Sequence, residues 1–326
     1  MTARYSVSIL IPVKKDNKNL RECIEACLRL DYADFEIVVL PDEAIDLPYG
    51  DKIKIILTGS VDPARKRDMA MDKTRGEITA FLDDDAYPRQ DWLNNAVRHF
   101  EGEATAAVCG PAVTPDTDTL LQKASGYVYS SFLVSGPHNK RYIPRELCEV
   151  DDYPSCNFLV RKDVLREIGG FDTKFWPGED TVLCLKVTKE LKKKIIYDPA
   201  VLVYHHRRPL FKRHLKQIRS YALHRGYFVK RFPQTSLRAA YFFPSVFVAG
   251  LIIGGISSVF SPTLKAFYLQ VILVYLILAL YNSLKYSSPR LKFVVFLGII
   301  FTHLTYGVYF VKGLLAKRLA EENENE

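Results

Sequence analysis

Short apolar runs recur through the first 85 residues, each bounded by polar or turn-forming residues: Val7–Pro12, 35–41, 52–57 and 77–82. Such runs are typical of buried strands. Between the first two runs, apolar residues recur at helical spacing, and Asp16 or Asn17 could cap that helix. This β-α-β order predicts an α/β fold with a mostly parallel mixed sheet, in which ligands bind beyond the carboxyl ends of the strands.

A second patterned region runs from about residue 155 to residue 204. It contains a strand-like run at 156–160, a helical pattern that begins near Glu179, and strand-like runs at 195–197 and 201–204. We expect these elements to complete the same domain.

Three long apolar stretches follow, at 241–260, 264–284 and 291–311. Each could cross a hydrocarbon core of roughly 30 Å as a helix. None contains Asp, Glu or Arg, and a soluble bundle of such helices would have no polar face. The predicted organisation is therefore an α/β domain, a transmembrane region of about three helices and a disordered acidic tail, over residues 1–232, 233–314 and 315–326.

Basic residues indicate the orientation of these segments. They precede the first apolar stretch and recur in the loop that holds Lys285, Arg290 and Lys292, so both places should be cytoplasmic. Three crossings would then put the end of the chain outside, against which Lys312, Lys317 and Arg318 argue. One segment could instead be interfacial or re-entrant. The first stretch is the weakest candidate for a regular membrane-spanning helix, because Pro244 interrupts its first turns.

Net charge and cysteine content limit the classes of binding partner and the cellular compartment that we expect. The net charge is +8, and the basic residues concentrate between Arg207 and Arg238, next to the first apolar stretch. This favours membrane lipids or an anionic lipid-linked substrate, and we expect no nucleic acid partner. The six cysteines include no CxxC pair, which indicates reduced thiols. The first residues lack the apolar core of a signal peptide, so we expect the α/β domain to stay on the cytoplasmic side of the cell membrane.

An acidic cluster, Asp83, Asp84 and Asp85, directly follows the fourth apolar run. If the strand continues, Asp83 and Asp85 project to the same side. Carboxylate oxygens of this kind suit Mg²⁺ or Mn²⁺ that bridges substrate phosphates, and such a metal would assist a diphosphate leaving group. The alternative is a solvated loop or a helix cap.

The chain resembles the family 2 inverting glycosyltransferases with a GT-A type nucleotide-binding domain. The resemblance covers about residues 6–232 and is carried by ordered segments at 8–13, 37–42, 64–67, 75–93, 157–161, 168–172 and 176–180. The sequence departs from the family at Leu40-Pro41-Asp42-Glu43, where relatives often carry Asp-Asp-Gly-Ser. That departure leaves the identity of the nucleoside base open.

The resemblance implies a donor site. Pro12 and Asp42 would line the nucleoside pocket, with Asp42 accepting a hydrogen bond from the base, although an Asp here could also be a turn former. Arg65 would lie beside the base or its phosphates. Asp83 and Asp85 match the two ends of the family's Asp-x-Asp element, with Asp85 as the direct metal ligand. The remaining donor-site residues implied are Asp84 and Trp92.

On the acceptor side, Glu179 and Asp180 begin a helical pattern, where carboxylates commonly complement the helix dipole. The resemblance instead implies that Asp180, beside Glu179, is the general base that removes a proton from the acceptor hydroxyl. A helix N-terminus should lower the pKa of Asp180, so we expect catalysis to rest on positioning.

Further residues follow from the resemblance. His205 would be a third metal ligand, where a structural histidine is the alternative. The residues that would contact the diphosphate or the acceptor are Asn157, Trp176, Arg207, Arg219 and Arg225. The arginines among them could equally form a basic surface that faces the membrane.

The expected activity is transfer of one sugar from a UDP- or GDP-sugar to a lipid-linked or cell-envelope glycan acceptor. Processive synthases of this superfamily carry Gln-x-x-Arg-Trp, and Gln217-Ile-Arg-Ser-Tyr221 does not match it. A short processive synthase is the second enzyme hypothesis. A membrane scaffold that keeps the fold without turnover is the third possibility, since fold alone does not establish function.

Overall fold

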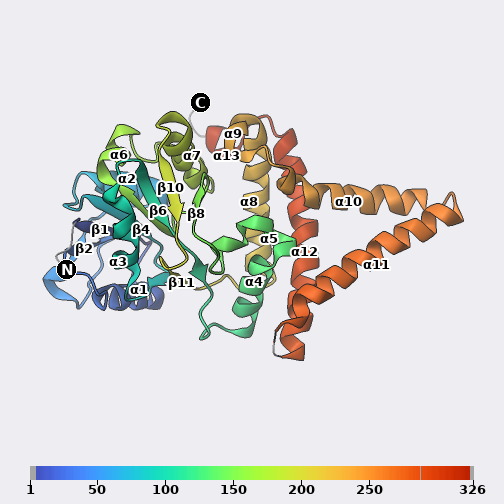
Figure 1. The fold of residues 1–326 in the computed structure, drawn as a ribbon, viewed down its shortest axis with the longest axis horizontal. Helices are drawn as coiled ribbons and strands as arrows, with labels where there is room; N and C mark the ends of the chain where they lie inside the picture. Colours follow the sequence, from blue (N-terminus) through green and yellow to red (C-terminus); the bar gives the residue numbers. More distant parts are fainter. Residues whose placement is uncertain (1–4, 287, 324–326) are drawn as a thin grey trace. The chain divides into compact units, whose positions relative to one another are not determined.

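The computed structural model describes residues 5–286 and 288–323 (Figure 1). The chain forms two compact units: Met1–Pro115 with Lys140–His206, and Asp116–Asn139 with Arg207–Glu326. The units therefore divide after His206, and residues 116–139 belong with the C-terminal helices. None of these divisions lies at residue 232. The predicted end of the first functional domain at that residue therefore remains a prediction.

The first unit is built on a sheet of eight strands, in the order β3 (Ile53–Ile55), β2 (Phe35–Leu40), β1 (Val7–Pro12), β4 (Ile78–Leu82), β9 (Asn157–Arg161), β6 (Thr105–Cys109), β10 (Lys194–Tyr197) and β8 (Cys148–Val150). Strands β3, β2, β1 and β4 pair in parallel. Strand β9 pairs antiparallel with both of its neighbours, β4 and β6. The predicted α/β fold with a mixed sheet is confirmed.

A smaller sheet has the order β5 (Ala86–Pro88), β11 (Val203–His205) and β7 (Ala112–Val113). Strand β11 runs antiparallel to β5, and His205 lies opposite Ala86. The main sheet confirms the four predicted N-terminal strands to within two residues at either end. Strands β5 to β8 were not predicted; β5, β7 and β8 are only two or three residues long, too short for a periodic pattern.

Helices cover both faces of the main sheet. The first unit holds α1 (Lys18–Leu28), η1 (Gly50–Lys52), α2 (Pro63–Met71), α3 (Trp92–Val97), η2 (Arg98–Glu101), α6 (Lys162–Glu167), α7 (Glu179–Leu185) and η4 (Lys186–Glu190). Of the two candidate caps of α1, the structure selects Asn17, whose side-chain oxygen accepts from the backbone of Asn19 at 2.9 Å and of Leu20 at 3.1 Å.

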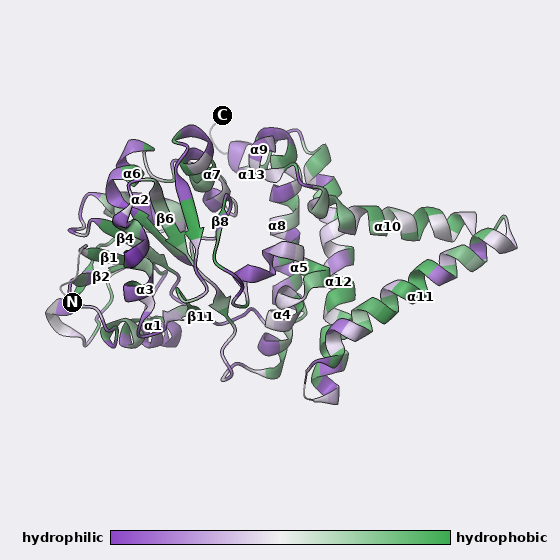
Figure 2. Cartoon of the chain, viewed as in Figure 1, coloured by the Kyte–Doolittle hydropathy of each residue, from purple (hydrophilic) through white to green (hydrophobic). Residues whose placement is uncertain are grey.

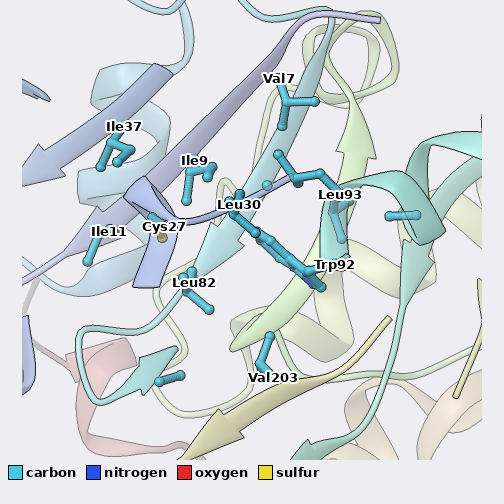
Figure 3. Close-up of a cluster of buried hydrophobic side chains, with 14 of the residues drawn as sticks. Val7, Ile9, Ile11, Cys27, Leu30, Ile37, Leu82, Trp92, Leu93 and Val203 are labelled. Carbon is cyan, nitrogen blue, oxygen red and sulfur yellow. The ribbon is translucent and has the colours of Figure 1, made fainter. Parts of the chain in front are cut away.

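The core of this unit lies on both faces of the sheet. Ile9 and Ile11 of β1 pack on one face with Trp92 (Figure 3), whereas Leu10 packs on the other face with Phe81. All are fully or almost fully buried. Burial on both faces explains why β1 is apolar at successive positions instead of alternating with polar residues.

The second unit is helical. It holds α4 (Leu120–Ser130), α5 (Phe132–Ser135), α8 (Lys212–Arg231), α9 (Pro233–Ser236), α10 (Ala239–Ser257), α11 (Pro262–Leu284), α12 (Pro289–Leu315) and α13 (Ala320–Asn323), and the short helix η3 (Gly136–Arg141) follows α5. All six cysteines lie in the first unit as free thiols.

Helices α10, α11 and α12 confirm the three predicted apolar segments (Figure 2). Three helical segments, Ala239–Ser257, Pro262–Leu284 and Pro289–Glu322, are long and apolar enough to cross a membrane. Helix α10 runs through Pro244, so this residue does not break it.

The segment predicted to be a disordered tail has structure in its described part. Residues Ala320–Asn323 form α13, and Leu319 is buried at 3% exposure. The Glu321 carboxylate lies 2.8 Å from His224 Nε2 on α8. An acidic composition therefore did not prevent order here, because basic residues of α8 offer partners.

Buried polar side chains join the helices of the second unit. The ring of His214 on α8 is fully buried, with Nδ1 2.8 Å from the Ser125 hydroxyl of α4 and Nε2 3.0 Å from the Thr302 hydroxyl of α12. Burial lowers the pKa of His214 to about 3. The neutral ring thus holds three helices together through two hydrogen bonds.

This arrangement predicts a pH-dependent stability. The folded pKa of His214 lies below its ordinary value of 6.5, so as the pH falls the unfolded chain takes up a proton before the folded chain does. The folded state should lose about 2 kcal/mol from this residue between pH 6.5 and pH 5. In a melting experiment in detergent, His214→Gln should be destabilised most at about pH 8, and its difference from wild type should shrink towards pH 5. A difference that does not change with pH would contradict the assignment.

Candidate functional site

Lys66 on α2 joins the loops that follow the first three strands. Its ammonium donates to the carbonyl oxygens of Val13 at 2.9 Å and Leu40 at 3.0 Å, and to the Thr58 hydroxyl at 2.9 Å. It also pairs with Asp42 Oδ1 at 2.5 Å, and the lysine itself is only 2% exposed. A buried ammonium needs such partners, so Lys66 fixes the carboxyl ends of β1 and β2 and the Asp42 carboxylate together.

The predicted nucleoside-pocket residues lie at this end of the sheet. Pro12 is the buried last residue of β1, opposite Leu40. Asp42 follows β2, and the ion pair with Lys66 holds it in place. The hydrogen bond from a base to Asp42 remains a prediction.

Arg65 lies on the exposed side of α2, and its contact with a nucleotide remains a prediction. Helix α2 turns Ala64, Arg67 and Ala70 towards the sheet, whereas Arg65 is exposed. Since residues three apart lie on one face of a helix, the inward arginine is Arg67. Sequence reasoning missed both Lys66 and Arg67, although the small residues Ala64 and Ala70 mark the side of the helix that faces the sheet.

Asp83, Asp85 and His205 form one cluster. One ligand atom from each side chain lies within 4.8 Å of the others. Strand β11 brings His205 beside β5, so that its Nε2 is 3.0 Å from Asp85 Oδ1, and the His206 N–H donates to the Asp85 carbonyl at 2.9 Å. Two carboxylates and one imidazole can together hold a divalent cation such as Mn²⁺ or Mg²⁺.

Asp84 points elsewhere. Its carboxylate accepts from the Asn17 amide at 2.9 Å, at the start of α1. Burial, together with the neighbouring charges of Asp85 and Asp83, raises the pKa of Asp84 to about 6, and the bond from Asn17 offsets part of this rise. Asp84 therefore links the acidic turn to α1 and is not a member of the cluster of three.

Arg67 connects the acidic cluster with a second group of side chains. Its guanidinium donates to Asp83 Oδ1 at 2.8 Å and to the Ser155 hydroxyl at 2.7 Å. It stands over the rings of Phe81 and Phe171, 5.3 Å and 5.6 Å from their centroids, and is 2% exposed. Its positive charge also lowers the pKa of Glu179 and Asp180.

Burial nevertheless outweighs that effect. It raises the pKa of Glu179 to about 8 and that of Asp180 to about 6, although hydrogen bonds from Ser155 lower the latter. We expected the N-terminus of α7 to lower the pKa of Asp180, and this was wrong, because the loss of solvent is the larger effect. Burial thus favours the protonated form of both carboxyls, and more strongly that of Glu179.

One oxygen of this pair is unsatisfied. Asp180 Oδ1 is buried, and no hydrogen-bond donor reaches it from the residues that the structure describes. Glu179 instead accepts from the Gly178 N–H at 2.8 Å. A buried carboxylate oxygen without a partner is costly, and it keeps an unused capacity to accept a hydrogen bond.

Trp92 and Asn157 support the site instead of lining it. Both are fully buried, and the Trp92 indole donates to Asn157 Oδ1 at 2.9 Å. The Asn157 amide donates to the carbonyl oxygens of Gly110 and Val201, each at 2.8 Å. Their polar groups are thus occupied within the protein, contrary to the predicted contacts with a donor or acceptor.

The other predicted acceptor residues divide between the units. Trp176 belongs to the first unit and is 49% exposed, three residues before Glu179. Arg207, Arg219 and Arg225 all belong to the second unit. Within that unit, the Arg219 and Arg225 guanidinium groups lie over the rings of Tyr309 and Tyr241, at 5.4 Å and 4.8 Å. The role of these four residues remains a prediction.

Comparison with known families gives a match to this part of the chain. Residues 8–169 match the model of the family described as glycosyl transferase family 2. The matched region includes the loops joined by Lys66 and the carboxylates Asp83 and Asp85, and it ends before Asp180.

Three curated relatives are similar over the same region. The pre-mycofactocin glycosyltransferase of Mycobacterium tuberculosis is 28% identical over 62% of this chain and 43% of its own length. The glucosyl-dolichyl phosphate glucuronosyltransferase of Haloferax volcanii is 23% identical over 58% of this chain and 64% of its own length. A dolichyl-phosphate-sugar glucuronosyltransferase of Methanococcus voltae is 22% identical over 69% of this chain. The chain thus covers less than two thirds of the first two relatives.

A solved structure shares the fold. The mannosyltransferase PcManGT of Pyrobaculum calidifontis, determined with GDP-Man and Mn²⁺, matches 97% of this chain and 89% of its own chain, with a TM-score of 0.56 and 18% identity. The family match, the relatives and this fold together show that the chain belongs to glycosyl transferase family 2, with a GT-A-like α/β domain followed by three helices apolar enough to span a membrane.

Proposed function

We propose that this protein is an inverting transferase that moves a single sugar from a UDP- or GDP-sugar to a lipid-linked or cell-envelope glycan acceptor. It would act as a multi-pass protein of the cell membrane, with the α/β unit on the cytoplasmic face. The observation that carries the proposal is the buried, unpartnered oxygen of Asp180, joined through Arg67 to the cluster of Asp83, Asp85 and His205.

The donor side follows from the strand ends. Asp42, held by Lys66, would accept from the nucleoside base, and Asp83, Asp85 and His205 would hold Mg²⁺ or Mn²⁺. When bound, such a cation neutralises charge on the departing nucleotide diphosphate. Two relatives whose names include dolichyl-phosphate sugars support a lipid-linked acceptor, and the solved neighbour with GDP-Man and Mn²⁺ supports the donor class.

The acceptor side rests on Asp180. Its free oxygen can accept the hydrogen of an acceptor hydroxyl, take up that proton as the oxygen attacks the anomeric carbon, and so favour attack opposite the departing diphosphate. Burial raises the pKa of Glu179 and so disfavours a second negative charge beside Asp180. Arg67 compensates the charge that Asp180 retains before it takes up the proton.

Replacement of the base should separate chemistry from binding. Asp180→Asn should lower kcat by about 10²- to 10⁴-fold, the usual range for a general base, while the Kd for the nucleotide diphosphate stays near that of wild type. Transfer from labelled UDP- and GDP-sugars to polyprenyl-phosphate acceptors in membranes measures the first quantity, and calorimetry measures the second. Asp163→Asn, an exposed carboxylate on α6, is the matched control and should keep full activity. Equal transfer rates for Asp180→Asn and wild type would refute the assignment.

The pH profile should report the raised pKa of Asp180. The base must be ionised, so kcat/KM should fall as the pH drops through about 6, well above the ordinary carboxyl value of 3.8. Initial rates between about pH 5 and pH 8, at saturating metal, test this. An acid limb near pH 4 would show that Asp180 is not the group that titrates.

The metal cluster predicts a graded loss of nucleotide binding. Asp85→Asn should abolish the increase in UDP or GDP affinity that Mn²⁺ produces, and His205→Ala should reduce it, because each removes one ligand. Binding without metal should change little in either variant. Calorimetric titrations with and without Mn²⁺ make the comparison, and an undiminished Mn²⁺ effect in Asp85→Asn would rule out this cluster.

A further inference from the structure

Helices α8 and α12 lie side by side over much of their length. His214 of α8 contacts Thr302 of α12 at 3.0 Å. Further along, a Cβ added at Gly226 would lie 2.1 Å from the Phe310 carbonyl oxygen, and one added at Gly313 would lie 1.9 Å from the Leu223 carbonyl oxygen. The two backbones therefore touch, and any placement of α12 in a membrane also places α8.

Helix α8 is a poor candidate for a helix inside the hydrocarbon core of a membrane. Its sequence contains no Asp or Glu, and its exposed residues include Lys212, Arg213, Lys216, Arg219, Lys230 and Arg231. At a rise of about 1.5 Å per residue, its 20 residues are about 30 Å long, the thickness of a hydrocarbon core. If α12 crossed the membrane, α8 would cross beside it and carry the uncompensated charges of Lys216 and Arg219 through the interior.

The end of the chain is bound to the same helix. Beyond α12, the Ala316 carbonyl oxygen accepts from Lys230 Nζ at 2.6 Å, and Glu321 pairs with His224 at 2.8 Å. Residues 207–211 alone join α8 to the last strand of the α/β unit. The segment after α12 is therefore held against α8, and a topology in which α8 does not cross the membrane keeps this segment on the side of α8.

Helices α10 and α11, unlike α12, do not pack along α8 and are held at their ends. Near the start of α10, the Tyr241 hydroxyl lies 3.3 Å from His138 Nε2, and near the end of α11, the Ser131 hydroxyl donates to Asn282 Oδ1 at 3.0 Å. Both ends are thus held by the segment 116–139. Between them the helices run out to a shared tip, where Val259 and Phe260 are 81% and 80% exposed (Figure 2).

We propose that α10 and α11 cross the membrane as a hairpin, while α8 and α12 lie along the headgroup layer, with the basic residues of α8 against anionic lipid headgroups. This topology replaces three crossings with two. It places Lys312, Lys317 and Arg318 on the same side as the other basic segments, as the distribution of positive charge favours. Lys265, the one basic residue of α10 and α11, lies near the tip and reaches the opposite headgroup layer.

Labelling of single cysteines tests this topology. The probes are Lys174→Cys in the α/β unit, Val259→Cys at the tip and Lys317→Cys after α12, all exposed positions, in a Cys148→Ser background because the other five cysteines are buried. In oriented membrane vesicles, an impermeant maleimide should label Lys174→Cys and Lys317→Cys from one side and Val259→Cys from the other. Labelling of Lys317→Cys together with Val259→Cys would establish three crossings and overturn the proposal, whatever sugar is transferred.

A depth measurement gives an independent test. In vesicles that contain phosphatidylglycerol, a nitroxide on Lys216→Cys should be relaxed by a water-soluble nickel chelate, as expected at headgroup depth. The matched probe Leu273→Cys on α11 should be relaxed by oxygen instead. Oxygen relaxation at both positions would place α8 in hydrocarbon and overturn the proposal.

Discussion

The buried guanidinium of Arg67 is the contact on which the acidic site depends. Like charges at close range disfavour one another's ionisation, and α7 and the turn after β4 bring Glu179, Asp180 and Asp83 to one region. Arg67 bonds to Asp83 and also lowers the pKa of the other two carboxyls. Two aromatic rings and Ser155 hold it in place, so the position of α2 on the sheet determines how much negative charge the site can carry.

The strand ends could be predicted because their apolar runs are continuous and end at carboxylates. The same reasoning could not identify Arg67, since Ala-Arg-Lys-Arg resembles a solvated helix face and only the helix phase distinguishes Arg65 from Arg67. Trp92 and Asn157 were assigned to ligands because motif matching does not reveal burial. Burial also reversed the expected pKa of Asp180, where a local helix argument omitted the surrounding protein.

The helical unit shows what sequence composition cannot predict, namely which helices pack together. Length and hydropathy identified α10, α11 and α12 correctly, but they treat each helix as isolated. The contacts of α12 with α8 join an apolar helix to a strongly basic one, and no window along the sequence contains both. Segment 116–139 was likewise assigned to the α/β domain, because its neighbours in sequence belong there.

That interleaving has a consequence for how the protein is made. Helices α4 and α5 emerge early during synthesis. The Leu133 carbonyl oxygen, however, forms its hydrogen bond with His303, which is translated 170 residues later. Until α12 is complete, Ala124 and Val128 lack the apolar residues Val295 and Ile299 that cover them. Synthesis of the α/β unit is therefore completed while the apolar residues that cover its insertion are still untranslated.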